Sequence, residues 1–438
     1  MSTRRFLFTM WEGGGAVPPM LGIARRLIGR GHVVRVLGDP TIGAEATSAG
    51  CSFTPWRRAP HRTTLRPEDD LMKDWEASSP LAMMGRLRDV FITAPAERYA
   101  ADTLDAMAQW PVDAIVSDYF LFGAMMAAEK AGIPRVAVIP NIWPLPTPGA
   151  PAFGPGFLPA RSALGRMRDA LLNALTLRLF DRALPALNAT RGRLGLAPSR
   201  AFFEQCLASQ AVLVLTSARF DFSSRAVAGN VHYVGPILDD PEWAEPWRPP
   251  WPPENRDPLV LVGFSSTFQD QAAVLRRVVE ALATLEVRAL VTLGEMLDEH
   301  EVRSSGAVVV VRSARHRDIL PHAALLVTHC GHGTTLKGLA AGVPMVCMPM
   351  GRDQNDTAAR VVHAGAGVRL RPSAAPRVIR AAVLRVLGDG RYRLAAQRMA
   401  EAIALEQADV DPLAPIERVV GAAPPTRDPD RATAKSTR

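Results

Sequence analysis

The fold of this chain is decided by residues 324–370, which read ALLVTHCGHGTTLKGLAAGVPMVCMPMGRDQNDTAARVVHAGAGVRL. The apolar run at 323–327 is typical of a buried parallel strand. A turn with two glycines follows, and a helix is predicted over 334–341, because Gly342 supplies a stop signal. A second apolar run at 345–348 predicts another strand. This order of strand, turn, helix and strand indicates an α/β unit with a parallel sheet.

The turn at 328–335 suits a phosphate or a diphosphate. Glycines let a ligand approach the main chain closely, and the free N–H groups and positive dipole end of a following helix attract an anion. His329 and Thr334 can add side-chain hydrogen bonds to the same anion. Taken alone, however, Gly331 and Gly333 are explained equally well by an ordinary connection between a strand and a helix.

A pair of polar residues follows the next predicted strand. Asp353 and Gln354 lie beyond its carboxyl end, where open α/β sheets bind ligands. A carboxylate beside an amide can hold vicinal hydroxyl groups, because the first accepts hydrogen bonds and the second both donates and accepts them. The segment therefore combines a candidate anion site with a candidate clamp for hydroxyl groups.

Together these residues resemble the donor-binding signature of nucleotide-sugar-dependent glycosyltransferases with the GT-B fold. That signature reads His-x-Gly-x-Gly-Thr, then Gly-Val-Pro, then Pro-x-x-x-Asp-Gln. The matching positions here are His329, Gly331, Gly333, Thr334, Gly342, Val343, Pro344, Pro349, Asp353 and Gln354. One position departs from the family, which usually places Glu where Lys337 stands, so the resemblance does not imply the donor contact that this carboxylate makes in the family.

The resemblance spans residues 4–420 and implies an α/β fold with two Rossmann-like domains that face each other across a cleft, each a parallel sheet with flanking helices. The segments it implies are an N-terminal acceptor-binding domain (1–235), a Pro- and Trp-rich linker (236–257), a C-terminal donor-binding domain (258–405), a helix that returns to the first domain (406–423) and a disordered polar tail (424–438).

The resemblance also implies which residues bind the donor. They belong to the turn after a strand at 259–264, to the segment after a strand at 308–311 that holds the nucleotide base, and to the signature itself. The implied donor-binding residues are Ser266, Thr267, Ala314, His316, His329, Gly331, His332, Gly333, Thr334, Asp353 and Gln354. We expect a TDP- or UDP-sugar as co-substrate, with no metal site and no other cofactor.

The loop after the first predicted strand departs from the family at the position of the residue that activates the acceptor. Members usually carry Gly-His-x-x-Pro there, and this His is the general base. Aligned on Pro19, the Gly falls on Gly15 and the His on Ala16, and alanine cannot take a proton. Three explanations stay open: another residue is the base, the acceptor ionises so easily that it needs little help, or the chain is an altered or catalytically weak variant.

Two carboxylates are candidate catalytic residues. Asp118 ends a predicted strand at 113–118 and stands where family members carry the Asp that orients the catalytic His. It can act as the base directly or through a water, but an Asp before a helix is most often a helix cap. Glu12, one loop away, is the second candidate.

Four residues are candidate acceptor contacts: Trp11, Gly15, Ala16 and Trp143. The loop at 141–157 is rich in Pro, Gly and aromatic residues, which suits a hydrophobic acceptor. Packing inside the domain explains its aromatic residues equally well.

Other segments carry structural predictions. Residues 54–88 are irregular and, in the family, form variable loops of the acceptor pocket. Residues 161–194 read as a long helical stretch interrupted at Pro185. The density of proline at 239–258 excludes helix and central strand, so we expect a linker whose tryptophans pack on a domain surface: Trp243, Trp247 and Trp251.

Composition narrows the class of protein. The chain has 438 residues, 48% of them hydrophobic, which is enough for two domains with their own cores. Its net charge is +8, but the arginines are spread along the chain with no basic block among aromatics, so nucleic-acid binding is not expected.

The sequence contains no run of about eighteen apolar residues, so no membrane span is predicted, and its start reads as a strand and not as a signal peptide. Four scattered cysteines favour reduced thiols in a cytoplasmic enzyme, for which a homodimer is the assembly we consider.

The resemblance therefore implies an inverting glycosyltransferase that moves a hexose or deoxyhexose from a TDP- or UDP-sugar to a small hydrophobic natural product. A sugar-nucleotide epimerase of the same fold and a non-catalytic nucleotide-sugar-binding partner protein are the alternatives. A dinucleotide-dependent oxidoreductase fits less well. Gly13-Gly14-Gly15 only loosely imitates its glycine fingerprint, and Asp353 and Gln354 would have no role.

Overall fold

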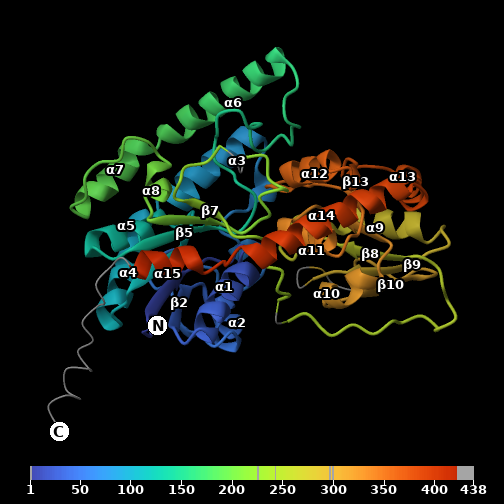
Figure 1. The fold of residues 1–438 in the computed structure, drawn as a ribbon, viewed down its shortest axis with the longest axis horizontal. Coiled ribbons are helices and arrows are strands. Elements are labelled where there is room, and N and C mark those ends of the chain that lie inside the picture. The colour runs from blue at the N-terminus through green and yellow to red at the C-terminus, as the bar shows by residue number, and fades with distance from the viewer. Residues whose placement is uncertain (1, 224–225, 242, 295–296, 298–299, 422–438) are drawn as a thin grey trace, which may run out of the picture.

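The computed structural model describes residues 2–223, 226–241, 243–294, 297 and 300–421. Within these ranges the chain forms two parallel sheets flanked by helices, which lie next to each other in Figure 1. The predicted α/β fold of two Rossmann-like domains is therefore confirmed.

The first sheet has seven parallel strands in the order β3-β2-β1-β4-β5-β6-β7. Its order reverses direction between β1 and β4, where Phe6 pairs with Val34 on one side and with Ala114 on the other. The strands are β1 (Arg5–Thr9), β2 (Val33–Gly38), β3 (Ser52–Pro55), β4 (Ala114–Asp118), β5 (Arg135–Ile139), β6 (Ala211–Val214) and β7 (Val231–Tyr233).

The second sheet repeats this order over six parallel strands, β10-β9-β8-β11-β12-β13. Its reversal lies between β8 and β11, where Val262 pairs with Val327. The strands are β8 (Leu259–Gly263), β9 (Arg288–Thr292), β10 (Val308–Val311), β11 (Leu325–Thr328), β12 (Met345–Cys347) and β13 (Gly367–Arg369). Such a reversal point opens a crevice at the carboxyl ends of the strands, where ligands bind in this kind of sheet.

The strands are buried, which explains why apolar runs in the sequence predicted them. Every residue of β4, β5 and β8 is buried, because helices cover both faces of a parallel sheet. The strands predicted at 113–118, 259–264, 308–311, 323–327 and 345–348 are all present within about two residues. The short edge strands β3 and β13 have no apolar run of their own and were not predicted.

Helices connect the strands and pack on both units. Their bounds are α1 (Val17–Gly29), α2 (Gly43–Ser48), α3 (Pro80–Arg86), α4 (Ala96–Gln109), α5 (Phe122–Ala131), α6 (Ala163–Asp181), α7 (Leu184–Arg193), α8 (Glu204–Leu207), α9 (Ala272–Leu282), α10 (His316–Ile319), α11 (His332–Ala340), α12 (Gln354–His363), α13 (Pro376–Gly388), α14 (Gly390–Asp409) and α15 (Ala414–Gly421). Helix α11 begins two residues before its predicted start.

Two predicted segments differ from the structure. Residues 54–88 are not irregular throughout, because α3 forms where Ser79 caps its first turn by accepting a hydrogen bond from the Ala82 N–H at 3.2 Å. The interruption predicted at Pro185 lies earlier, between Asp181 and Leu184. Pro185 falls in the first turn of α7, where a missing N–H costs no helical hydrogen bond.

The C-terminal part of the chain connects the second unit back to the first. Helix α14 packs in the second unit, and the chain then crosses to the first, where α15 contacts β5 and β6, as the red helices in Figure 1 show. Ile416 and Val420 of α15 lie in the same core cluster as Phe6. Of the three linker tryptophans, Trp247 and Trp251 pack against a core cluster that lies mainly in the second unit, as predicted, whereas Trp243 lines the cavity described below. The predicted tail at 424–438 lies outside the described residues. None of the helices in the described ranges is long and apolar enough to cross a membrane.

Candidate active site

A cavity of about 1270 Å³ lies between the two units and is lined by both. It collects almost all the residues that the sequence analysis singled out, from loops at the carboxyl ends of the strands. From the first unit these are Trp11, Glu12, Gly15, Ala16 and Asp118, and from the second they are Ser266, Thr267, Ala314, His316, His329, Gly331, His332, Gly333, Thr334, Asp353 and Gln354.

The two units approach each other closely at this cavity. Gly14, in the loop after β1, has a φ of 65°. A Cβ atom at this position would lie 2.4 Å from Thr267 Cγ2 of the second unit. Glycine is required here both by the left-handed backbone and by the contact.

The start of α11 forms one wall of the cavity. The N–H groups of the first turn of a helix have no partner inside the helix, so those of His332, Gly333 and Thr334 are available to an anion. Gly331 precedes the helix, and a Cβ there would lie 2.5 Å from His329 Nε2. The glycine thus lets the imidazole fold back beside the helix start.

His329 is a neutral hydrogen-bonding group. Burial lowers its pKa to about 4, although a hydrogen bond to the Gly263 carbonyl partly offsets this effect. Its ring stacks on Phe264, with the ring centroids 5.7 Å apart. At neutral pH the imidazole is uncharged and has one N–H, which either the Gly263 carbonyl or an anion in the cavity can accept.

Two further histidines of this wall also have lowered pKa values, of about 4, because they are buried. His316 Nε2 lies 3.1 Å from Thr292 Oγ1, so its ring is held by β9. His332 Nε2 lies 2.9 Å from Thr216 Oγ1 of the first unit, which joins the two units next to the cavity. Both side chains therefore already have partners in the protein.

The predicted hydroxyl clamp is only partly free. Asp353 lines the cavity, and burial raises its pKa to about 6. The Gln354 amide is engaged in its own loop: Oε1 accepts from the Met350 and Gly351 N–H groups, at 2.8 and 3.1 Å. Its Nε2 donates to Gln269 Oε1 at 2.9 Å. Gln354 therefore shapes the loop, and Asp353 is the more available hydroxyl acceptor.

Lys337, which replaces the Glu of the family signature, lies in the same wall. Its Nζ donates to Asp240 Oδ1 at 2.5 Å. Asp240 comes from the linker and also accepts from the Arg317 N–H at 3.2 Å. A carboxylate thus does reach this wall, but from a position 97 residues away in the chain. Sequence analysis missed it, because no local pattern marks Asp240.

The facing wall holds the two candidate bases. Asp118 is fully buried, and its Oδ1 accepts from the Phe120 N–H at 2.9 Å. Burial raises the pKa of this carboxyl to about 7, although the Phe120 hydrogen bond and the Trp11 indole oppose the rise. Ala16 occupies the N-cap position of α1, and its side chain makes no capping hydrogen bond.

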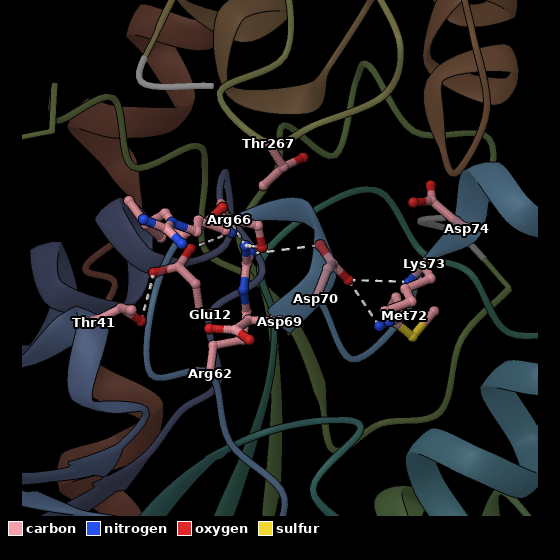
Figure 2. Close-up of polar contacts among 12 residues, drawn as sticks. Glu12, Thr41, Arg62, Arg66, Asp69, Asp70, Met72, Lys73, Asp74 and Thr267 are labelled. Atoms are coloured by element: carbon pink, nitrogen blue, oxygen red, sulfur yellow. Dashed lines mark hydrogen bonds and ion pairs between the residues drawn. The ribbon is translucent and has the colours of Figure 1, made fainter. Parts of the chain in front are cut away.

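Glu12 is held more firmly by its own surroundings. Its Oε1 accepts from the Gly14 N–H at 2.9 Å, and its Oε2 lies 3.5 Å from the Thr41 hydroxyl. Figure 2 shows this carboxylate beside Thr41 and the Arg66 segment. Its N–H donates to Asp39, a buried carboxyl whose pKa burial raises to about 7. These contacts make Glu12 a part of the loop scaffold.

The rest of the facing wall is apolar. It is formed by the 65–87 segment, the loops after β4 and β5, and one face of α6. Its apolar residues include Leu65, Met72, Trp75, Met83, Met84, Leu87, Phe120, Leu175, Leu179 and Phe180. Trp143 does not belong to it. The Trp143 indole N–H donates to Thr147 Oγ1 at 2.8 Å, and its ring packs inside the first unit, as the packing explanation of this residue requires.

Sequence analysis also missed Arg352 and Asp74, which form an ion pair at the cavity from opposite units. Asp74 lies in the segment that the sequence left without residue roles. Among the described residues, no group of three His, Cys, Asp or Glu side chains is arranged to hold a metal ion.

Two sheets with the same strand order and a cavity between them, with a helix start on one wall, form the GT-B fold. Residues 276–413 match the family described as erythromycin biosynthesis protein CIII-like, C-terminal domain. The chain belongs to this family of GT-B glycosyltransferases of natural-product biosynthesis, and it is a glycosyltransferase.

Individual relatives agree with this assignment. The chain is 30% identical to 4'-demethylrebeccamycin synthase of Lentzea aerocolonigenes, over 95% of this chain and 99% of the relative. It is 26% identical to demethyllactenocin mycarosyltransferase of Streptomyces fradiae, over 90% of this chain and 81% of the relative. The crystal structure of the kitacinnamycin glycosyltransferase has the same fold, with a TM-score of 0.75 at 21% identity, covering 96% of this chain and 100% of that one.

Proposed function

We propose that this glycosyltransferase moves a hexose or deoxyhexose, with inversion, from a TDP- or UDP-sugar to a hydroxyl group of a small hydrophobic natural product. The observation that carries the proposal is a cavity that has two unlike walls. One wall offers N–H groups at a helix start, and the other is apolar with one buried carboxyl group.

The donor wall suits the leaving diphosphate. The first N–H groups of α11 and the one N–H of neutral His329 can donate to the same region, where the positive end of the helix dipole also lies. Preorganised donors of this kind stabilise the charge that develops as the sugar–phosphate bond breaks. The proposal therefore includes no obligatory metal ion, and it expects product formation to continue in the presence of a chelator.

Asp118 suits the role of general base. An acceptor hydroxyl loses its proton to the Asp118 carboxylate while its oxygen bonds to the anomeric carbon, and the diphosphate leaves from the opposite face of the sugar. A general base works best with a pKa near the working pH, and burial brings Asp118 to about 7. Glu12 is a weaker candidate, because both of its carboxylate oxygens are engaged in the loop.

The apolar wall suits the acceptor. Ten or so apolar side chains face a cavity of about 1270 Å³, which is more than one nucleotide sugar needs and leaves room for an aglycone. The methionines Met72, Met83 and Met84 are flexible and polarisable, so they can adapt to an irregular apolar surface.

The test is product formation. The purified protein is mixed with TDP- and UDP-sugars and with phenolic, indole and macrocyclic acceptors, and products are identified by mass spectrometry and by the anomeric coupling in NMR. A glycoside of inverted configuration is expected. Conversion of the sugar nucleotide to an epimer without acceptor would indicate the epimerase, and tight nucleotide binding with no product on any acceptor would indicate the non-catalytic partner protein.

A further inference from the structure

One guanidinium group joins the two units at the cavity. Arg352 Nε and Nη2 donate to the two carboxylate oxygens of Asp74, at 2.7 and 2.9 Å. Its third nitrogen, Nη1, donates to Thr267 Oγ1 at 2.9 Å. A planar guanidinium can make such a two-point bond to a carboxylate and a third bond at once, whereas a lysine cannot. Arg352 thus contacts two other segments of the cavity wall.

The three segments that meet at Arg352 belong to different parts of the site. Arg352 itself precedes Asp353, the available acceptor of the hydroxyl clamp. Thr267 belongs to the turn after β8, where Ser265 Oγ lies 3.0 Å from the Thr267 hydroxyl. Asp74 belongs to the acceptor wall of the other unit and is 278 residues away from Arg352 in the chain.

The backbone of Arg352 is itself unusual. Its φ is 52°, a left-handed conformation that is uncommon in residues other than glycine. Such a conformation persists where surrounding contacts over-determine it, and it often occurs at functional sites. Here three hydrogen bonds of the side chain hold it, at the residue directly before the clamp.

Hydrogen bonds and an aromatic contact hold the segment around Asp74 in place. We call residues 70–76 the 70–76 loop. Asp70 Oδ1 accepts from the N–H groups of Met72 and Lys73, at 2.8 and 3.1 Å, as Figure 2 shows. Trp75 packs edge-on against Phe268 of the second unit, with ring centroids 5.1 Å apart. Met72, Asp74 and Trp75 all line the cavity, so a shift of this loop changes the acceptor wall.

We propose that Arg352 is a positioning residue that sets the acceptor wall relative to the donor site. The proposal rests on the transfer reaction proposed above. The Arg352–Asp74 pair fixes the 70–76 loop against the turn at Thr267 and the clamp at Asp353, so that an acceptor resting on the loop is aligned with the anomeric carbon. In well-oriented reactions a misplacement of about 1 Å can cost about 100-fold in rate.

Other contacts also attach the two units, and the side chains that make them, those of Arg360, Asp221 and Asp356, do not line the cavity. Arg360 Nη2 donates to Asp221 Oδ1 at 2.7 Å, and Asp356 accepts from the N–H groups of Gly154 and Gly156. These contacts provide the matched control. Asp221→Asn weakens a buried pair between the units without changing a side chain that lines the cavity.

The kinetic test uses a double-mutant cycle of Asp74→Asn, Arg352→Gln and the combined variant. Each single variant is expected to lower kcat/KM for the acceptor by about 10- to 100-fold. The Kd for TDP or UDP, measured by calorimetry, is expected to change by less than about threefold. The double variant should be no slower than the worse single one, since both remove the same interaction. Asp221→Asn should lower Tm while leaving kcat/KM for the acceptor nearly unchanged.

A second measurement needs no turnover. Hydrogen exchange of the 70–76 loop amides is followed with and without added TDP or UDP. Arg352→Gln should raise this exchange by about tenfold or more, while the amides of β4 stay as protected as in the wild type. If the wild type forms no product, the proposed function is wrong, but the exchange measurement still tests the positioning role. Unchanged exchange in Arg352→Gln, additive losses in the cycle, or equal losses of kcat/KM in Asp221→Asn would overturn the positioning role.

Discussion

The two sheets have the same strand order, yet their reversal points are used differently. In the second unit, the loops after β8 and β11 bring backbone N–H groups, small hydroxyl side chains and neutral histidines to the cavity. In the first unit, the loops after β1 and β4 bring a tryptophan, a run of glycines and one buried carboxyl group.

This difference follows from what each wall would hold. A diphosphate is recognised by backbone geometry, so the second unit needs glycines at fixed spacing beside a helix start. An apolar acceptor is recognised by the shape of side chains from many segments, and the residues of this wall are accordingly spread along the first unit. The same topology therefore supports one wall made mainly of backbone and another made of side chains.

The largest expected effect comes from removing the proposed base on the first wall. Asp118→Asn should lower kcat by about 10²–10⁴-fold while the Kd for TDP or UDP stays the same, because the donor wall is unchanged. Initial rates with saturating donor and calorimetry measure the two quantities. A variant as active as the wild type would instead favour an acceptor that ionises without help.

The pH dependence tests the same carboxyl group. Because burial raises the pKa of Asp118 to about 7, its basic form increases as the pH rises through about 7. The wild-type kcat/KM for an acceptor alcohol should therefore rise with pH and level off above this value. The Asp118→Asn variant should lack this inflection, and a persisting one would assign the titration to another group.

The matching change on the second wall is His329→Ala. It removes a neutral N–H donor and the stacking partner of Phe264. The rate should fall by about 10²–10³-fold, in the range of one lost donor to a developing anion, and TDP or UDP should bind more weakly. Loss of rate with unchanged nucleotide affinity would indicate that His329 acts only in the transition state.

The approach of the two walls can be tested at Gly14. In Gly14→Ala, the new Cβ would lie 2.4 Å from Thr267 Cγ2 at a φ of 65°, so the walls must separate. We expect kcat/KM to fall about tenfold, since small misplacements are costly in aligned reactions. The control is Gly29→Ala, where nothing lies within 4 Å of the added atom. Equal rates in both variants would mean that the loop adapts.

The smallest effect concerns the altered position of the donor signature. Lys337→Met leaves the buried Asp240 carboxylate without its cation. The free energy of unfolding should fall by about 1–3 kcal/mol, which denaturant titration measures. Arg391→Met, which removes an exposed pair with Asp389, should leave the unfolding midpoint unchanged. A stable Lys337→Met variant would show that Asp240 is satisfied by the Arg317 segment alone.

The sequence by itself determined the features that depend on short-range patterns. The strands β11 and β12, the glycine turn, the helix that follows it and the placement of Asp353 are all encoded within residues 324–370, where spacing along the chain sets spacing in space. The departures at Ala16 and Lys337 were also visible, because each replaces a residue inside a recognisable pattern.

Only the tertiary structure decided which distant side chains complete these patterns. The Arg352–Asp74 and Lys337–Asp240 pairs join segments 278 and 97 residues apart, and no periodicity encodes such meetings. Trp143 could be assigned to the core only once its hydrogen bond to Thr147 was known, and Gln354 to its own loop only once its partners were placed. The physical reason is that a side chain's role depends on which partners satisfy its polar atoms and cover its apolar surface, and folding brings those partners from anywhere in the chain.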